Sequence, residues 1–295
     1  MGNRELAKEM LKGAIDIHVH GGPDIFPRPL NDIEVARKAQ EAGMRAVLLK
    51  SHTEGTAGRA TVATYVTGFS MYGGLALNHP VGGLNPEAVR VAVQMGAKQV
   101  WMPTIHSEFA MLKAANSAAQ FAKQLKRGPA GIGLLGADGR IKDELLEIID
   151  IIAEADISLA TGHVSPQEAM AVIEEAKKRG VKKIVLTHPT SPILSYTIEQ
   201  MKETVRLGVS MLEHVVCDTT HHWKDPISST VISDAIRAIG PANTIMSTDS
   251  GQIINPDPVP SMENFICMML DDGIPQEDIR RMTVDNPAMI LGIDP

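Results

Sequence analysis

The chain alternates short apolar runs with longer segments whose apolar residues recur at helical spacing, and this rhythm repeats about eight times. Strands are expected at 14–20, 46–52, 74–79, 99–104, 157–163, 183–188, 209–215 and 243–249. Helices are expected in the intervals, for example at 29–42, 86–95, 107–126, 142–155, 166–179 and 193–207. Strand followed by helix, repeated eight times without a Gly-rich phosphate loop, favours a closed (β/α)8 TIM barrel. An open flavodoxin-like sheet is the structural alternative.

A chain of 295 residues fits one such barrel, so a single domain spanning residues 1–295 is predicted. The interval between the fourth and fifth strands is about twice as long as the others. Within it, Gly131 to Lys142 contains two short extended pieces around Asp138-Gly139, which is a hairpin signal. We interpret residues 131–142 as a small insertion over one end of the barrel.

Composition excludes several classes of protein. A net charge of -7 gives no basic surface for a phosphate backbone, so nucleic acid is not an expected partner. No apolar run approaches the roughly 18 residues of a membrane span, so no membrane partner is expected either. Cys217 and Cys267 are too few for a disulfide framework, and the charged amphipathic start does not resemble a secretion signal. A reducing cytoplasm is therefore the expected setting.

Titratable side chains lie at the C-terminal ends of several predicted strands. Barrel strands are buried on both faces, so a titratable side chain there needs a specific partner. These side chains are His18 and His20 on the first strand, His163 on the fifth, His188 on the sixth and Asp249 on the eighth. Side chains two apart on a strand share a face, so both imidazoles of the first strand can point at one spot. Neutral imidazoles with one carboxylate suit zinc, ahead of iron, manganese or nickel. A divalent metal centre, with one or two ions, is thus predicted at this end of the barrel.

This pattern resembles the metal-dependent amidohydrolase superfamily, which carries His-x-His on strand 1, one His each on strands 5 and 6, and Asp on strand 8. The segment from Thr283 to Ile293 also resembles the Asn-Pro-Ala and Leu-Gly signature that often closes such barrels. The resemblance implies that Asp249 takes a proton from the attacking water and returns it to the leaving group. It further implies that His188 either binds metal or polarises the substrate oxygen. Barrels of this family often associate, so a homo-oligomer is expected although no interface is visible in the sequence.

One feature departs from the family pattern. Many members carry a carbamylated Lys or a Glu at the end of strand 4, whereas residues 100–104 here read Val-Trp-Met-Pro-Thr. Lys50, at the end of the second strand, is a candidate metal ligand if it is carbamylated. The alternative is that Lys50 stays a cation and binds a substrate carboxylate or a neighbouring Asp.

Further residues are candidates for contact with substrate. His52 and His79 end the second and third strands, and Asp24 and Arg28 follow the His-x-His, where a plain surface turn is the alternative. One of Glu213 and His214 must point inward from the seventh strand, and His214 is included as a substrate contact. Asp16 either orients a ligand imidazole or caps the start of its strand.

The sequence therefore predicts a metal-dependent hydrolase that cleaves a C–N or C–O bond of a small molecule, such as an amide or a lactone. A phosphoesterase and a non-oxidative decarboxylase are alternatives on the same scaffold. A non-catalytic barrel that binds metal or ligand is the alternative from another class, and the presence of Asp249, a proton shuttle, argues against it.

Overall fold

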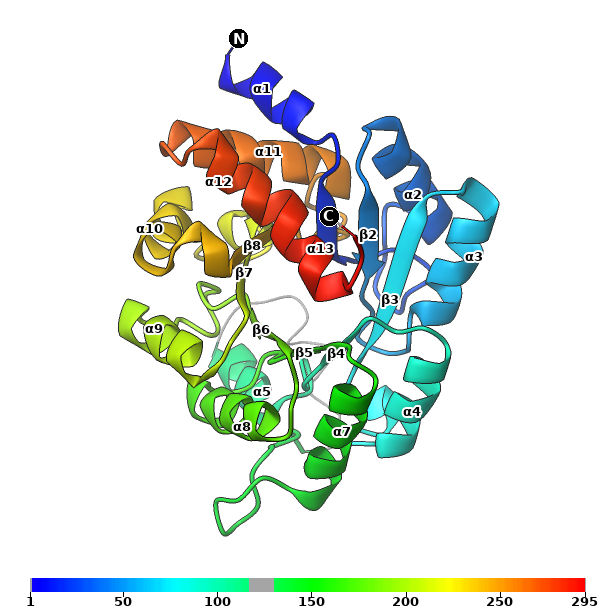
Figure 1. Ribbon diagram of the computed structural model, residues 1–295, viewed down its shortest axis with the longest axis vertical. Helices are drawn as coiled ribbons and strands as arrows, with labels where there is room; N and C mark the ends of the chain where they lie inside the picture. The colour runs from blue at the N-terminus through cyan, green and yellow to red at the C-terminus, as the bar shows by residue number, and fades with distance from the viewer. Residues whose placement is uncertain (1, 117–129, 295) are drawn as a thin grey trace.

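The computed structural model describes residues 2–116 and 130–294, and its centre is one sheet of eight parallel strands in the order β1 to β8 (Figure 1). Every strand pairs with the next one along the chain. The strands are β1 (Ile15–Val19), β2 (Ala46–Leu49), β3 (Ser70–Ala76), β4 (Gln99–Trp101), β5 (Ser158–Ala160), β6 (Lys183–Thr187), β7 (Met211–Val215) and β8 (Thr244–Ser247).

The sheet closes on itself between β1 and the residues that follow β8. Val19 and Ser250 form a parallel bridge, the Asp249 N–H donates to the His18 carbonyl at 2.9 Å, and the His20 N–H donates to the Ser250 carbonyl at 2.8 Å. The predicted (β/α)8 barrel is therefore confirmed, and the open-sheet alternative is wrong.

The buried carboxylate of Asp16 reinforces this β1–β8 seam. It accepts hydrogen bonds from the Thr248 hydroxyl at 2.6 Å, the Thr248 N–H at 3.1 Å and the His18 N–H at 3.2 Å. Burial raises the pKa of Asp16 to about 7 against the opposing effect of the Thr248 hydrogen bonds. Asp16 thus fixes the backbone that carries His18, and these hydrogen bonds do not involve an imidazole ring.

Helices surround the strands, as Figure 1 shows. The helices between the strands, or next to them, are α1 (Asn3–Met10), α2 (Asp32–Glu41), α3 (Ala57–Thr67), α4 (Pro86–Gln94), α5 (Glu108–Asn116), α7 (Asp143–Glu154), α8 (Pro166–Lys178), α9 (Ile198–Leu207), α10 (Ser229–Ile239) and α11 (Pro258–Asp271). A run of helical turns follows, with α12 (Gln276–Arg280), a π-helical turn at Arg281–Asp285 and α13 (Asn286–Leu291). Of the predicted helix at 107–126, residues 117–126 lie outside the described residues.

Several predicted strands end earlier in the structure, such as β4 at Trp101 rather than 104, and two further boundaries moved for identifiable local reasons. The helix predicted from residue 193 begins only at Ile198, because Thr197 is its N-cap and exchanges hydrogen bonds with Gln200. Strand β3 begins at Ser70 rather than 74, because Gly73 and Gly74 lie inside it. A Cβ on Gly73 would lie 2.4 Å from the Ala57 nitrogen and one on Gly74 2.3 Å from the Gln99 carbonyl oxygen, so these glycines permit close packing.

The barrel interior is filled from its N-terminal end by the helix α13. The inward side chains of the strands, among them Ile15 and Ala46, form one buried cluster with Ala288, Ile290 and Leu291 of α13. Asn286 fixes this helix by donating from its amide to the carbonyl oxygens of Thr244, at 2.6 Å, and Pro241, at 2.8 Å. The opposite end of the barrel, at the C-terminal ends of the strands, we call the mouth.

The predicted turn at Asp138-Gly139 forms. Leu135 and Ile141 make an antiparallel bridge, the Gly136 N–H donates to the Arg140 carbonyl at 2.8 Å, and Gly139 has a φ of 78°. Among the described helices, none is long and apolar enough to cross a membrane.

The seam yields a stability prediction. We expect Asp16→Ala to lower the free energy of unfolding by about 2 kcal/mol or more, because two buried N–H groups and a hydroxyl lose their acceptor. Asp16→Asn should lose much less, because its amide oxygen can still accept from both N–H groups. Urea denaturation followed by circular dichroism measures both. Equal losses in the two variants would show that these hydrogen bonds do not stabilise the seam.

Candidate metal centre

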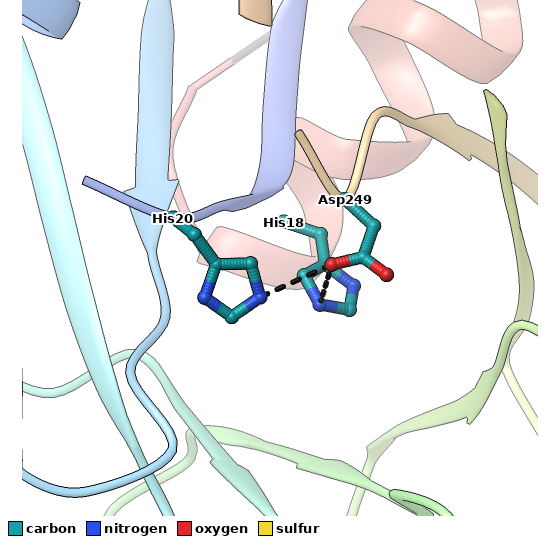
Figure 2. A group of neighbouring side chains, drawn as sticks. All are labelled: His18, His20 and Asp249. Carbon is teal, nitrogen blue, oxygen red and sulfur yellow. Dashed lines mark ion pairs between the residues drawn. The ribbon is translucent and has the colours of Figure 1, made fainter. Parts of the chain in front are cut away.

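Three predicted ligands meet at the mouth, on the two strands that close the barrel. The Oδ1 atom of Asp249 lies 3.2 Å from Nε2 of His18 and 3.1 Å from Nε2 of His20. Figure 2 shows the two rings side by side beneath the carboxylate, with their Nε2 atoms turned toward it. Among the described residues, these three side chains could together hold a metal ion, because their ligand atoms all lie within 4.8 Å of one another.

The backbone around these residues is shaped to bring them together. Asp249 has a φ of 49°, a left-handed conformation that turns the chain sharply after β8. Gly251, with a φ of 131°, lets the next segment pass so close to β1 that a Cβ there would lie 2.0 Å from the His20 carbonyl oxygen. Close approach at the seam is therefore what places the carboxylate over both imidazoles.

The spacing and charge of the three groups fit a divalent cation. Two atoms that bind one zinc ion at about 2.1 Å lie roughly 3.0 to 3.4 Å apart, and both measured separations fall within this interval. Burial lowers the pKa of His20 well below its usual value, which favours the neutral ring. Burial opposes ionisation of Asp249, but the neighbouring His18, His20 and Lys50 outweigh it and hold the pKa of this carboxyl well below its usual range. Neutral imidazole and ionised carboxylate are the forms that bind metal.

The other two predicted ligands form a pair beside this group. Nε2 of His163, beyond β5, lies 3.1 Å from Nε2 of His188, beyond β6. The His188 and His18 ring centroids are 5.8 Å apart, so the pair adjoins the first group. Burial lowers the pKa of both rings, that of His188 to about 4. The structure thus brings all five predicted ligands to one end of the barrel, as a group of three and a group of two.

Lys50 lies beside the first group of candidate ligands. It follows β2, is 2% exposed, and its Nζ is 2.8 Å from Nε2 of His18. It also lies 5.6 Å from the ring of Trp101, the last residue of β4. Burial lowers the pKa of Lys50. Both predicted roles of Lys50 require a place beside the metal ligands, and it has one.

The structure settles which residue of β7 faces the site. Glu213 points into the barrel and its Oε1 accepts a hydrogen bond from Nδ1 of His18 at 3.1 Å. His214 is on the opposite face of the strand, where Nδ1 lies 3.1 Å from the Thr190 hydroxyl, and burial lowers its pKa to about 4. The substrate role predicted for His214 therefore has no support from its position.

His52 is placed within reach of the centre. Its ring centroid is 4.9 Å from that of His20 and 6.4 Å from that of His163, and its Nδ1 lies 3.0 Å from the Thr104 hydroxyl. Asn78 supports this arrangement by donating to the Thr104 hydroxyl at 2.7 Å and to the His52 carbonyl at 3.0 Å. Nothing in the sequence distinguishes Asn78 from an ordinary loop asparagine.

Asp24 and Arg28 interact mainly with each other. Nε and Nη2 of Arg28 donate to Asp24 Oδ2 at 3.0 and 2.8 Å, and Nη1 donates to the Gly251 carbonyl at 3.1 Å. This ties the loop after β1 to the loop after β8. Both side chains are almost fully buried in this ion pair, so neither is a free side chain of an exposed turn.

His79, another predicted substrate contact, interacts with residues outside the metal centre. Its Nε2 is 2.9 Å from the Ala130 carbonyl oxygen, and its ring is 4.9 Å from the ring of His106. Burial and the neighbouring His79 lower the pKa of His106 to about 4. These two histidines form a separate pair in the loops after β3 and β4.

Solved structures with the same fold confirm the predicted resemblance at the level of architecture. An amidohydrolase from Pseudomonas aeruginosa is 15% identical, with a TM-score of 0.61, 99% of this chain and 98% of that chain covered. A dihydroorotase is 14% identical, with a TM-score of 0.58 and coverages of 96% and 70%. An organophosphorus hydrolase from Deinococcus radiodurans is 15% identical, with a TM-score of 0.54 and coverages of 97% and 94%.

Comparison with curated protein sequences gives no significant match. One family model, described as a family of unknown function (DUF6282), matches residues 13–212, from just before β1 into β7 and over more than half of the chain. This (β/α)8 barrel therefore belongs to the family of unknown function DUF6282.

Proposed function

We propose that this protein is a metal-dependent hydrolase that cleaves a C–N or C–O bond of a small molecule, such as an amide or a lactone. The observation that carries the proposal is the convergence of His18 Nε2, His20 Nε2 and Asp249 Oδ1 at the mouth of the barrel. This is the end at which barrel enzymes place their chemistry. Neighbours with this fold include an amidohydrolase, a dihydroorotase and an organophosphorus hydrolase, which supports hydrolysis over other reactions.

His18, His20 and Asp249 would hold one ion, and His163 and His188 would contribute to a second. Zinc suits four imidazoles and a carboxylate. When bound, a divalent metal supplies Lewis acidity and makes a nearby water acidic enough to attack at neutral pH. The 3.1 Å separation of the His163 and His188 Nε2 atoms supports a two-ion site, because it matches the spacing within the first group.

Asp249 is positioned to move the proton. Its side chain is 15% exposed, against 0% for His18 and 1% for His20, so it is the ligand of the three that a substrate can approach. An ionised carboxylate can accept a proton from the attacking water and return it to the leaving nitrogen or oxygen. His52, with its pKa lowered by burial, is a neutral ring beside this path and can contact the substrate.

A phosphoester substrate is the second candidate, because one neighbour with this fold is an organophosphorus hydrolase. The same ligand set would serve attack on phosphorus. Assay of lactones, amides, phosphoesters and aromatic acids separates these reactions, and release of carbon dioxide alone would contradict the hydrolase proposal.

We expect His20→Ala to lower the bound metal by about one ion per chain, because it removes one of the three converging ligand atoms of the first ion. His79→Ala is the matched control, since this histidine pairs with His106 and should leave the metal content unchanged. Elemental analysis of the purified proteins after dialysis against zinc measures both. Wild-type protein that binds no transition metal would contradict the proposed function.

We expect Asp249→Asn to lower kcat on the best substrate of the panel by roughly 10²-fold or more, because the amide cannot take up a proton. The variant keeps an oxygen that can face His18 and His20, so zinc content is measured in the same preparation. A variant with normal kcat would exclude Asp249 as the proton carrier.

For Lys50 we propose the carbamylated form in the metal-loaded protein. An ammonium group at 2.8 Å from a nitrogen that binds a divalent cation would be strongly repelled by the ion. Loss of the ammonium proton gives the free amine, which adds to carbon dioxide and releases a second proton to form an anionic carbamate. The position of Lys50 beside His18 would make this carbamate a further ligand of the metal centre.

Carbamylation makes reconstitution depend on bicarbonate. We expect metal-free protein in carbon-dioxide-depleted buffer to take up less zinc than the same protein with added bicarbonate, and Lys50→Ala to show no such difference. Zinc content and intact mass under native conditions measure the effect. Equal zinc uptake by wild type in both buffers would leave Lys50 as a neutral or cationic side chain.

A further inference from the structure

Glu213 contacts one of the candidate metal ligands, His18, from another strand of the barrel. It lies on β7, whereas His18 lies on β1, and β8 stands between these strands in the sheet. The two side chains are fully buried, and Glu213 Oε1 lies 3.1 Å from His18 Nδ1. The contact therefore forms inside the closed barrel.

The chemistry of the contact fixes the proton on the ring. An ionised carboxylate can only accept a hydrogen bond, so Nδ1 of His18 must carry the hydrogen. With the hydrogen on Nδ1, the neutral ring presents the lone pair of Nε2, the atom that faces Asp249 at 3.2 Å. A hydrogen bond of this kind also orients the ring and makes the metal-binding nitrogen a stronger donor.

His18 differs in this respect from two of the other ligands. Among the described residues, Nδ1 of His20 and Nδ1 of His188 are buried without a hydrogen-bond partner. Those two rings meet other side chains only at Nε2, whereas His18 is also held at Nδ1. His18 is thus the one of these three ligands whose ring is fixed by the protein on the side away from Asp249.

The second oxygen of Glu213 lacks a hydrogen-bond partner among the described residues. This atom, Oε2, is buried, an arrangement that is unfavourable for structure alone. The other oxygen, Oε1, lies 3.1 Å from His18 Nδ1, so the carboxylate is placed directly behind the ring whose Nε2 faces Asp249. A buried carboxylate with an unpaired oxygen is stabilised by a nearby cation, such as a metal ion bound to His18.

We propose that Glu213 is a positioning residue, which fixes the tautomer and orientation of His18 and adds negative charge behind the metal centre. The inference rests on the proposed function, because it assumes that His18 Nε2 binds a metal ion. Groups that support a metal ligand in this way typically contribute about 10- to 100-fold to metal affinity.

The test compares Glu213→Gln with Glu213→Leu. Glutamine keeps an oxygen that can accept from Nδ1 but removes the charge, whereas leucine removes both. We expect Glu213→Leu to weaken zinc binding about 10- to 100-fold and Glu213→Gln to weaken it less, as measured by competition with a chromogenic chelator. Thermal unfolding of the metal-free proteins checks that each variant folds.

A second measurement reports the ring itself. In zinc-loaded protein labelled with ¹⁵N-histidine, NMR should show a His18 Nδ1–H proton far downfield in the wild type. We expect this signal to move upfield yet persist in Glu213→Gln, and to lose its hydrogen-bonded position in Glu213→Leu. A general loss of stability would not produce this graded change in one proton.

The outcomes separate the two proposals. Equal zinc affinity in wild type and Glu213→Leu, or an unchanged His18 Nδ1–H signal, would overturn the role of Glu213 and leave the metal centre intact. Wild-type protein that binds no zinc would overturn the proposed function together with this inference. If Glu213→Leu does not fold, Glu213→Gln decides: unchanged affinity with an unchanged signal overturns the role, and reduced affinity with an upfield shift supports it.

Discussion

The closure of the sheet between β1 and β8 is the constraint on which the candidate site depends. His18 and His20 lie on one side of this seam and Asp249 on the other, so the three ligand atoms meet only when the barrel is closed. The hydrogen bonds that Asp16 accepts from Thr248 and from the His18 backbone stabilise the same seam. The contacts that close the barrel between β1 and β8 therefore also set the geometry of the candidate metal site.

Several buried polar residues at the mouth are stabilised by a hydrogen-bond partner or a partner of opposite charge. Arg28 and Asp24 neutralise one another and join the loops after β1 and β8. Glu213 and Lys50 both contact the ring of His18, from opposite nitrogens. Burial lowers the pKa of His20, His163 and His188, which favours the neutral rings that bind metal.

Much of this arrangement could be predicted from the sequence, because strand periodicity and strand-end position are local properties. The barrel and the gathering of His18, His20, His163, His188 and Asp249 at its mouth follow from them. The orientation of Glu213 and His214 could not be predicted, since strand alternation shows that they face opposite ways but not which faces inward. The start of β3 was missed because Gly73-Gly74 resembles a turn, and only the packing of Ala57 and Gln99 explains it. The Arg28–Asp24 pair likewise depends on the neighbouring loop at Gly251.

The plug formed by α13 has a consequence for how the protein is made. Ile290 and Leu291 complete a core whose first members, Ile15 and Ile17, emerge from the ribosome some two hundred and seventy residues earlier. The contacts that join these segments are among the most distant that the chain can form, and folding that waits for such contacts is slow. During synthesis the early strands must persist with one side of their apolar faces uncovered, a state that favours aggregation or assistance by chaperones.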